Sequence, residues 1–224
     1  MPAIIELKEV TVNNEDGRAV FEDASLNLSG GQCVLIAAPP ASGKGALLNL
    51  ISGHALPDKG AVHLFGEDTR TLSKTGLNAA RKRMGFIMQE TILISNLKVI
   101  ENVALPLLYH SELTADECYN EALKMLDICG LAGDLWGLPG LLPVYARKSV
   151  AVAKALVMGP EVIVCENPAH GLNEDELSHL SGIIAGYHLS RPASLLVVTA
   201  RDETEIGAIK PGRIIHIQDG GFRE

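Results

Sequence analysis

The sequence has no excess of positive charge. Its 19 lysines and arginines are outnumbered by 27 aspartates and glutamates, so the formal net charge is −8. No basic stripe is present that would match a row of phosphates, and we therefore expect no nucleic acid partner. The first residues, MPAIIELKEV, show no charged segment followed by an apolar one, so no secretion signal is expected. No apolar run reaches the ~18 residues needed to cross a bilayer.

Cysteine and histidine are too scattered to indicate a metal site. No CxxC pair occurs among the four cysteines, which lie in apolar or helical stretches: Cys33, Cys118, Cys129 and Cys165. We expect buried free thiols in a reducing cytosol rather than disulfides. Six of the seven histidines share no spacing typical of metal ligands: His54, His63, His110, His179, His188 and His216.

Apolar strand patterns alternate with helical ones along most of the chain. Residues 33–38 are a continuous apolar run, as expected of a strand buried on both faces. Residues 161–168 are predicted as another buried apolar strand that runs into a loop, and residues 193–200 as a further strand. The block 90–156 is mostly helical in pattern, with breaks expected at Pro106, Gly130 and residues 137–143. This order predicts an α/β fold with a largely parallel sheet covered on both faces, interrupted by a helical subdomain.

A strand, a turn-rich loop and a helix follow one another at residues 33–53. The loop and the helix start occupy the positions of the phosphate-binding pattern GxxxxGK[ST]. The residues at these positions are Ala38, Pro39, Pro40, Ala41, Ser42, Gly43, Lys44 and Gly45. Loop amides and the helix N-terminus attract phosphate, and the lysine adds a full charge. The first glycine is replaced by Ala38, Pro40 removes an amide donor, and Gly45 lacks the hydroxyl that holds magnesium. The loop predicts weakened phosphate binding with magnesium poorly held. Taken alone, it fits an ordinary strand–turn–helix with an exposed lysine equally well.

Further motifs resemble the ATP-binding cassette (ABC) family over nearly the whole chain. Four stretches stand in the family's order and spacing: LPDKG (56–60), RKRMGFIMQ (81–89), LKVIENVALPLLYH (97–110) and SVAVAKALVMGPEVIVCENP (149–168). The resemblance is clearest to cassettes of the lipoprotein-release, FtsE and phospholipid (mammalian-cell-entry-associated) transport group. It implies a P-loop NTPase-like cassette with antiparallel N-terminal strands. It also implies ATP as the ligand of residues 38 to 46, Ala46 included, and of Gln89 in the Q-loop.

The string LSGGQ at residues 28–32 has the letters of the family's signature in the wrong place. Gly31 and Gln32 fall where the family has a Gly-Glu turn before the phosphate-loop strand, so turn-favouring residues explain the string. Counting back from Val150 places the signature at residues 142–146, LPVYA, where only the leucine survives.

The substituted signature lacks the groups that the resemblance requires there. In the family, a serine hydroxyl and glycine amides at a helix start hold the γ-phosphate bound by the opposite subunit. Pro143 offers neither a hydroxyl nor an amide donor. Val144 and Tyr145 add bulk where the backbone must approach closely.

The positions that carry hydrolysis in the family are also changed. ATP hydrolysis needs a magnesium ion, an oriented water and donors to the leaving phosphate. Glu166 replaces the Walker B aspartate, and Asn167, which cannot act as a general base, replaces the catalytic glutamate. Ala200 replaces a histidine and Asn173 replaces the D-loop aspartate. We expect no catalytic residue, and magnesium, if held, only weakly by Glu166 and Gln89.

The adenine-stacking aromatic of the family is missing as well, because no Phe, Tyr or Trp occurs between Met1 and Val20. Lys44 and Gln89 are the functional residues that survive. In the family's dimer, each ATP lies between the phosphate loop of one subunit and the signature of the other. If this chain paired with an intact cassette, one ATP site would lack the magnesium hydroxyl and the base, and the other would lack the signature.

We therefore predict a structural or regulatory cassette subunit with little or no ATP hydrolysis, acting in lipid or lipoprotein transport. The resemblance implies a membrane-spanning permease partner, a dimer with itself or with another cassette, and a peripheral position on the cytoplasmic face of the membrane. We expect one domain over 1–224, with a RecA-like core at 1–89 and 157–224 and a helical subdomain at 90–156. A weakly active ATPase and a free-standing nucleotide-sensing scaffold remain as alternatives.

Three further features have two interpretations each. His170 is either a substitute for the lost histidine or, more simply, a solvated loop residue. Residues 173–176, NEDE, are either a partner patch or a helix N-terminus carrying favourable negative charge. The apolar segment 91–109 is either subdomain core or, by the resemblance, a docking groove for a membrane subunit.

Overall fold

An antiparallel sheet forms one end of the molecule. The computed structural model describes residues 3–131, 133 and 135–224. The sheet has the strand order β2-β1-β4-β5 and consists of β1 (Ala3–Asn13), β2 (Ala19–Ser29), β4 (Lys59–Leu64) and β5 (Glu67–Asp68). A turn at Gly17, with φ of 76°, joins the first two strands. The inward-facing residues Ile5, Leu7 and Val10 are buried, as expected of a sheet with one covered face.

A mostly parallel sheet forms the centre of the molecule. Its strand order is β10-β9-β3-β8-β7-β6, and only β10 runs antiparallel to its neighbour. The strands are β3 (Cys33–Ala37), β6 (Met84–Ile87), β7 (Val162–Glu166), β8 (Leu195–Ala200), β9 (Arg213–Gln218) and β10 (Gly221–Arg223). The strand predicted at residues 193–200 is confirmed as β8, and every residue of β8 is buried.

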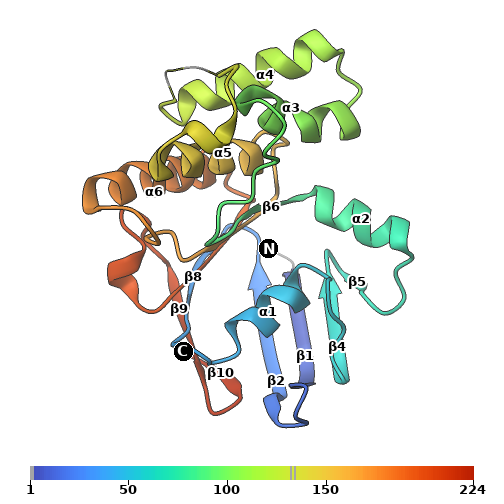
Figure 1. Ribbon diagram of the computed structural model, residues 1–224. Coiled ribbons are helices and arrows are strands. Elements are labelled where there is room, and N and C mark those ends of the chain that lie inside the picture. Colours follow the sequence, from blue (N-terminus) through green and yellow to red (C-terminus); the bar gives the residue numbers. More distant parts are fainter. Residues whose placement is uncertain (1–2, 132, 134) are drawn as a thin grey trace.

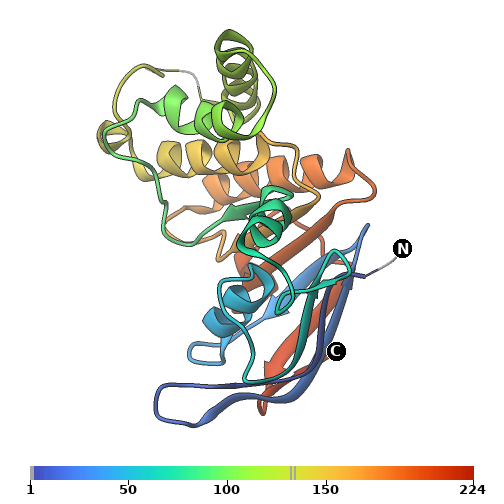
Figure 2. The ribbon, with the colours of Figure 1, turned by 90° about the vertical axis from the view of Figure 1, so that its right-hand side faces the viewer.

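Six α-helices and two short 3-10 helices complete the described part of the chain. The α-helices are α1 (Lys44–Ile51), α2 (Lys74–Lys82), α3 (Val99–His110), α4 (Ala115–Ile128), α5 (Val144–Leu156) and α6 (Glu174–Leu189). The 3-10 helices are η1 (Pro139–Leu141) and η2 (Glu203–Glu205). Figure 1 shows α3, α4 and α5 gathered at the end opposite the antiparallel sheet, and Figure 2 shows the same separation from the side.

Two hydrophobic cores lie on opposite faces of the parallel sheet. Val34 and Ile36 belong to the core shared with α1 and the antiparallel sheet, whereas Leu35 belongs to the core shared with α3 to α6. This alternation follows from the two-residue period of a strand. The predicted α/β fold, with a mostly parallel sheet, antiparallel N-terminal strands and a helical block, is confirmed.

Two details of the helical block differ from the prediction. No break occurs at Pro106, because α3 continues through it to His110. An interior proline costs a helix about 3 kcal/mol, but the fully buried side chains of Val99, Ile100 and Val103 hold α3 against the core. Residues 88–98 form a loop rather than a helix. None of the helices in the described ranges combines the length and apolar character that crossing a membrane requires.

Candidate functional site

The loop between β3 and α1 keeps the backbone shape of an anion-binding turn. Ala41 and Gly43 both have positive φ, at 62° and 100°. A Cβ added to Gly43 would lie 2.6 Å from Cγ1 of Val20 and 3.1 Å from Cζ of Phe21. Real Cβ atoms do not approach other atoms that closely. This position therefore needs a glycine, both to adopt the positive φ and to avoid the clash that a Cβ would make. The loop therefore turns sharply into α1, as a phosphate-binding loop does.

The N-terminus of α1 is open to an anion. The amides of the first helical residues, Lys44, Gly45 and Ala46, have no intrahelical acceptor, and no side chain caps the helix. A hollow of about 570 Å³ lies beside this end. The loop residues Ala38 to Ala41 line it with Gly43, Lys44 and Gly45, and four residues from other segments complete the lining: Gln89, Asn167, Arg201 and Glu205. A phosphate group fits the charge and the free amides at this place.

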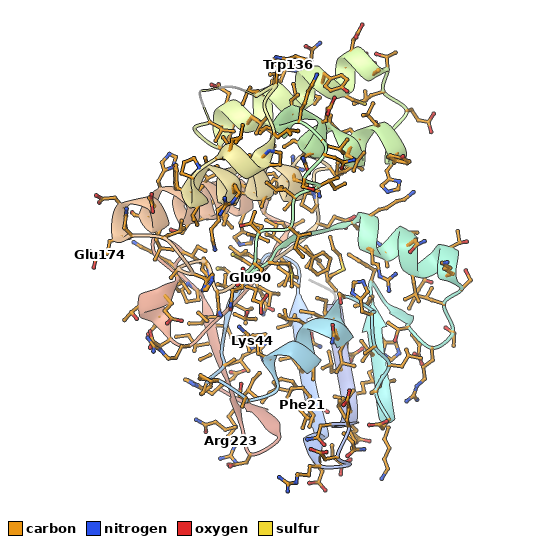
Figure 3. All side chains as sticks on the ribbon, in the orientation of Figure 1. Phe21, Lys44, Glu90, Trp136, Glu174 and Arg223 are labelled. Carbon is orange, nitrogen blue, oxygen red and sulfur yellow. The ribbon has the colours of Figure 1, made fainter. Side chains whose placement is uncertain are left out.

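The lysine of the loop is already paired within the chain. Nζ of Lys44 lies 3.2 Å from Oε1 of Glu166, and both side chains are largely buried, with 21% and 15% exposed. The second carboxylate oxygen of Glu166 accepts a hydrogen bond of 3.2 Å from the backbone N–H of Gln89. Figure 3 shows Lys44 in the middle of the molecule, between the strands and the helical end. Both oxygens of the Glu166 carboxylate, which the sequence predicted at the position of a magnesium ligand, therefore have internal partners.

Gln89, which the sequence predicted as the glutamine of a Q-loop, has contacts with three side chains. Nδ2 of Asn167 donates a short hydrogen bond to Oε1 of Gln89. Nζ of Lys148 donates to the carbonyl oxygen of Gln89 at 3.3 Å, while the Gln89 N–H contacts Glu166. Lys148 is buried on α5, and burial lowers the pKa of its ammonium group. The backbone and the side-chain oxygen of Gln89 are thus engaged without any ligand.

These residues do not fit a magnesium ion. Gly45 has no side-chain oxygen, the Glu166 carboxylate is paired with Lys44, and Oε1 of Gln89 accepts from Asn167. Within the described ranges, no group of three or more His, Cys, Asp and Glu side chains is arranged to hold a metal ion. Since magnesium prefers several oxygen ligands in octahedral geometry, the residues that remain are too few and are already occupied.

The remaining residues that the sequence singled out lie in different parts of the structure. Ser42 and Ala46 do not line the hollow, and Ala200 is fully buried in β8, where its carbonyl accepts from the Ala38 N–H at 2.9 Å. Asn173 caps α6 by accepting from the Glu176 N–H, which confirms the helix-start interpretation of that acidic run. His170 is a half-exposed loop residue whose Nε2 lies 3.2 Å from a carboxylate oxygen of Glu90.

The segment at the predicted signature position starts a helix, as expected. Pro143 is the N-cap of α5, and Val144 is the first residue of that helix. None of the residues 142–146 lines the hollow beside Lys44. The Tyr145 hydroxyl instead lies 2.6 Å from Nδ1 of His179, on α6. This segment is therefore separate from the hollow within one chain.

Sequence reasoning missed three residues of the site. Arg201 and Glu205 line the hollow and pair with each other, with 3.0 Å between Nη2 and Oε1. A charged residue directly after the buried strand β8 is a usable signal, because ligands bind outside the carboxyl ends of parallel strands. No sequence signal points to Lys148, whose contact with Gln89 spans 59 positions.

Comparison with known proteins gives a consistent set of relatives. The family model described as ABC transporter matches residues 21–170. The chain is 32% identical to the lipoprotein-releasing system ATP-binding protein LolD of Psychrobacter arcticus, covering 89% of this chain and 90% of LolD. It is 28% identical to the intermembrane phospholipid transport system ATP-binding protein MlaF of Escherichia coli, covering 88% and 72%.

A longer relative and a solved structure complete the comparison. The probable ribonucleotide transport ATP-binding protein mkl of Mycobacterium leprae is 29% identical, and the chain spans only 57% of its length. The fold is similar to a dimeric structure of the ATP-binding cassette MJ0796 bound to ADP and Pi in a post-hydrolysis state. The TM-score is 0.88 at 26% identity, with 98% of this chain and 97% of that chain covered.

Proposed function

Because the chain belongs to the ABC transporter family, we propose that it is a cassette subunit of a membrane transport complex with little or no ATP hydrolysis. Its role in that complex is structural or regulatory. The names of LolD and MlaF, a lipoprotein-releasing and a phospholipid transport protein, support lipids or lipoproteins as the cargo of the complex. The proposed position is peripheral, on the cytoplasmic face of the membrane.

The observation that carries this proposal is the closed contact network around Gln89. Glu166 is bound to Lys44 and to the Gln89 N–H, and Asn167 is bound to the Gln89 side chain. An amide cannot take a proton from water, so Asn167 supplies no general base. Activation of an attacking water needs a base and an oriented metal, and the chain's own residues provide neither.

Nucleotide binding without turnover fits the remaining features. The free amides at the start of α1 and the hollow of about 570 Å³ are suited to phosphate groups. Lys44 would exchange Glu166 for a phosphate oxygen when a nucleotide binds. The missing hydroxyl at Gly45 and the amide of Asn167 would still leave a magnesium ligand and the general base absent in that state. We propose that Ala38 to Ala46 and Gln89 contact the nucleotide, and that Arg201 lies at the same hollow as a second cation.

The proposed architecture is one cassette domain over 1–224, with the helical subdomain at 90–156 and the RecA-like core at 1–89 and 157–224. A permease subunit is the proposed membrane partner. The dimeric state of the MJ0796 cassette supports a dimer, with a second copy or with another cassette. The apolar segment 91–109 contributes Ile92 and Pro106 to a hollow beside β6, where the permease is proposed to dock.

The proposal is tested by calorimetric titration with ATP and by a turnover assay on the same preparation. We expect ATP binding that changes little when magnesium is chelated, that is lost in Lys44→Ala, and that is accompanied by no phosphate release. Lys59→Ala, which removes an exposed lysine on β4, serves as the matched control and leaves binding unchanged. Magnesium-dependent turnover that disappears in Lys44→Ala would establish a weakly active ATPase and overturn the proposal.

A further inference from the structure

Thr199, on β8, carries a buried hydroxyl that has no hydrogen-bond partner. The residue is fully buried, and its Oγ1 contacts no donor or acceptor within the described ranges. A hydroxyl in this situation gives up its hydrogen bonds to water on folding and gains none in return, so buried groups of this kind are rare. Thr199 therefore has a hydrogen bond to offer that this state of the protein does not use.

Thr199 lies directly beside Glu166 in the parallel sheet. The two residues are register partners on β8 and β7, so their side chains project from the same face. Val164 and Val197, two positions earlier on the same strands, belong to the core shared with α1, which identifies that face. Glu166 confirms the direction, because its Oε1 reaches Nζ of Lys44 on α1. Neighbouring strands are about 4.8 Å apart, so a small side-chain movement brings the hydroxyl and the carboxylate together.

We propose that Thr199 is a positioning residue whose hydroxyl donates to the Glu166 carboxylate when Lys44 turns to a phosphate group. The inference rests on the proposed function, in which Lys44 exchanges Glu166 for a phosphate oxygen. Oε1 of Glu166 is held by Lys44, and Oε2 accepts from the Gln89 N–H. The departure of Lys44 removes the partner of Oε1 while the side chain is only 15% exposed. A buried carboxylate that loses its cation needs another donor, and the Thr199 hydroxyl supplies it.

This exchange affects how strongly the loop binds a phosphate group. Without a donor at Oε1, the Glu166 carboxylate competes with the phosphate group for Lys44. A hydrogen bond from Thr199 offsets the loss of the ion pair and holds the carboxylate in place. The bond of 3.2 Å between Oε2 and the Gln89 N–H is then kept as well. Thr199 thus favours the state in which Lys44 is available to the ligand.

A second hydroxyl is the competing candidate for this role. Ser42, two positions before Lys44, also has a buried Oγ without a partner among the described residues. It lies on the loop that must surround the phosphate group, and its N–H donates to the carbonyl oxygen of Pro39 at 3.2 Å. Thr199, in contrast, is fixed beside Glu166 by the register of two strands, which favours Thr199 as the donor.

A double-mutant cycle on the purified full chain, without nucleotide, tests the exchange. Lys44→Met removes the ammonium group but keeps the side-chain length, so Oε1 of Glu166 loses its partner. Thr199→Val keeps the shape of the side chain without its hydroxyl. Urea denaturation gives the folding equilibrium constant of each variant.

The two substitutions are expected to be coupled. With Lys44 present, Thr199→Val should leave the folding equilibrium constant within about twofold or raise it, because the removed hydroxyl had no partner. In the Lys44→Met background it should lower that constant about tenfold or more, because a hydrogen bond to a charged carboxylate is lost.

Three controls separate this hydrogen bond from a change in packing. Thr199→Ser keeps the hydroxyl, so its effect should be the same with and without Lys44. In a Lys44→Met and Glu166→Gln background, the loss caused by Thr199→Val should fall below about threefold, because an amide is a weaker acceptor than a carboxylate. Thr69→Val removes a buried hydroxyl that likewise lacks a described partner but follows β5 in the other sheet, and it should show no coupling to Lys44.

Calorimetric titration with ATP measures the consequence for binding. We expect Thr199→Val to weaken ATP binding about fivefold or more, and Thr69→Val to change it less than about twofold. This titration needs no change at Lys44, so it applies even if Lys44→Met folds poorly. Absence of ATP binding by the wild-type chain would contradict the proposed function, while the nucleotide-free cycle would still decide the role of Thr199.

Three results would overturn the inference. The first is an equal effect of Thr199→Val in the presence and absence of Lys44. The second is coupling of Ser42→Ala, and not of Thr199→Val, to Lys44→Met, which would identify the loop hydroxyl as the donor. The third is an unchanged ATP affinity of Thr199→Val when the wild-type chain binds ATP.

Discussion

At the scale of single residues, Gly43 and Gly45 show how two glycines of one loop differ in their roles. Gly43 has a φ of 100° and no room for a Cβ, because Val20 Cγ1 would lie 2.6 Å away. Gly45 lies within α1, and a Cβ there meets nothing within 4 Å. The first glycine preserves the shape of the loop, whereas the second removes only a side chain.

Alanine at these two positions is expected to have opposite effects on stability. Gly43→Ala should lower the free energy of unfolding by about 1–3 kcal/mol, through backbone strain and the clash with Val20. Gly45→Ala should raise it by about 0.5–1 kcal/mol, because alanine loses less backbone entropy in a helix. Urea denaturation of both variants checks this pair, and equal destabilisation by the two substitutions would contradict it.

At the scale of elements, one buried side chain joins the loop 88–98 to α3. Asn102 is fully buried, and its Oδ1 accepts from the Ile94 N–H at 2.7 Å. Its Nδ2 lies within hydrogen-bond distance of the carbonyl oxygens of Ile94, Leu97 and Lys98. The loop also carries Ile92 at the hollow beside β6, so Asn102 holds the segment on which Ile92 lies.

Asn102→Ala is expected to lower the free energy of unfolding by about 2–3 kcal/mol. The reason is that the N–H and carbonyl groups of the loop lose their partner inside the protein. Limited proteolysis should then cut within residues 90–98 before the rest of the chain. Asn49→Ala, an exposed asparagine of α1, is the matched control and should stay within about 0.5 kcal/mol of the wild type. Equal protease resistance of Asn102→Ala and the wild type would refute the positioning role.

At the scale of the whole molecule, neutral thiols buried in the core shared with the helices make the free energy of unfolding depend on pH. Cys165 on β7 is fully buried, and burial raises the pKa of its thiol to about 12. Burial likewise raises the pKa of Cys129 to about 12. In the unfolded chain these thiols titrate near their ordinary value of 9.0. The folded molecule therefore keeps protons that the unfolded chain releases in alkaline solution.

The free energy of unfolding is expected to fall as the pH rises above 9. Above pH 9 the unfolded chain binds fewer protons than the folded one, so the stability that Cys165 contributes is full below pH 9 and is lost toward pH 12. Its share of the slope is up to about 1.4 kcal/mol per pH unit. Urea denaturation from pH 8 to 10.5 should give a shallower decline for Cys165→Ala. Val164→Ala, on the same strand, should keep the wild-type slope, and equal slopes for both variants would rule out the thiol.

Much of the fold could be predicted because it depends on local patterns. Apolar strand patterns predicted β3, β7 and β8, and the breaks expected at Gly130 and at residues 137–143 lie between α4 and α5. Pro106 was predicted wrongly as a break, since the rule for proline does not include the packing of α3 against the core. The role of the apolar segment 91–109 was only partly visible, because Val99, Ile100 and Val103 are buried in the core while Ile92 lines the hollow beside β6.

The sequence by itself determined the order of elements and the family resemblance, and it predicted the replacement of the hydroxyl, base and signature residues. These are properties of residue types at fixed spacings, and short-range sterics and periodicity suffice to interpret them. Only the tertiary structure decided that Glu166 pairs with Lys44 and that Asn167 and Lys148 hold Gln89. The physical reason is separation along the chain: the bonds to Gln89 span 59 and 78 positions, and such contacts form only when packing brings distant segments together.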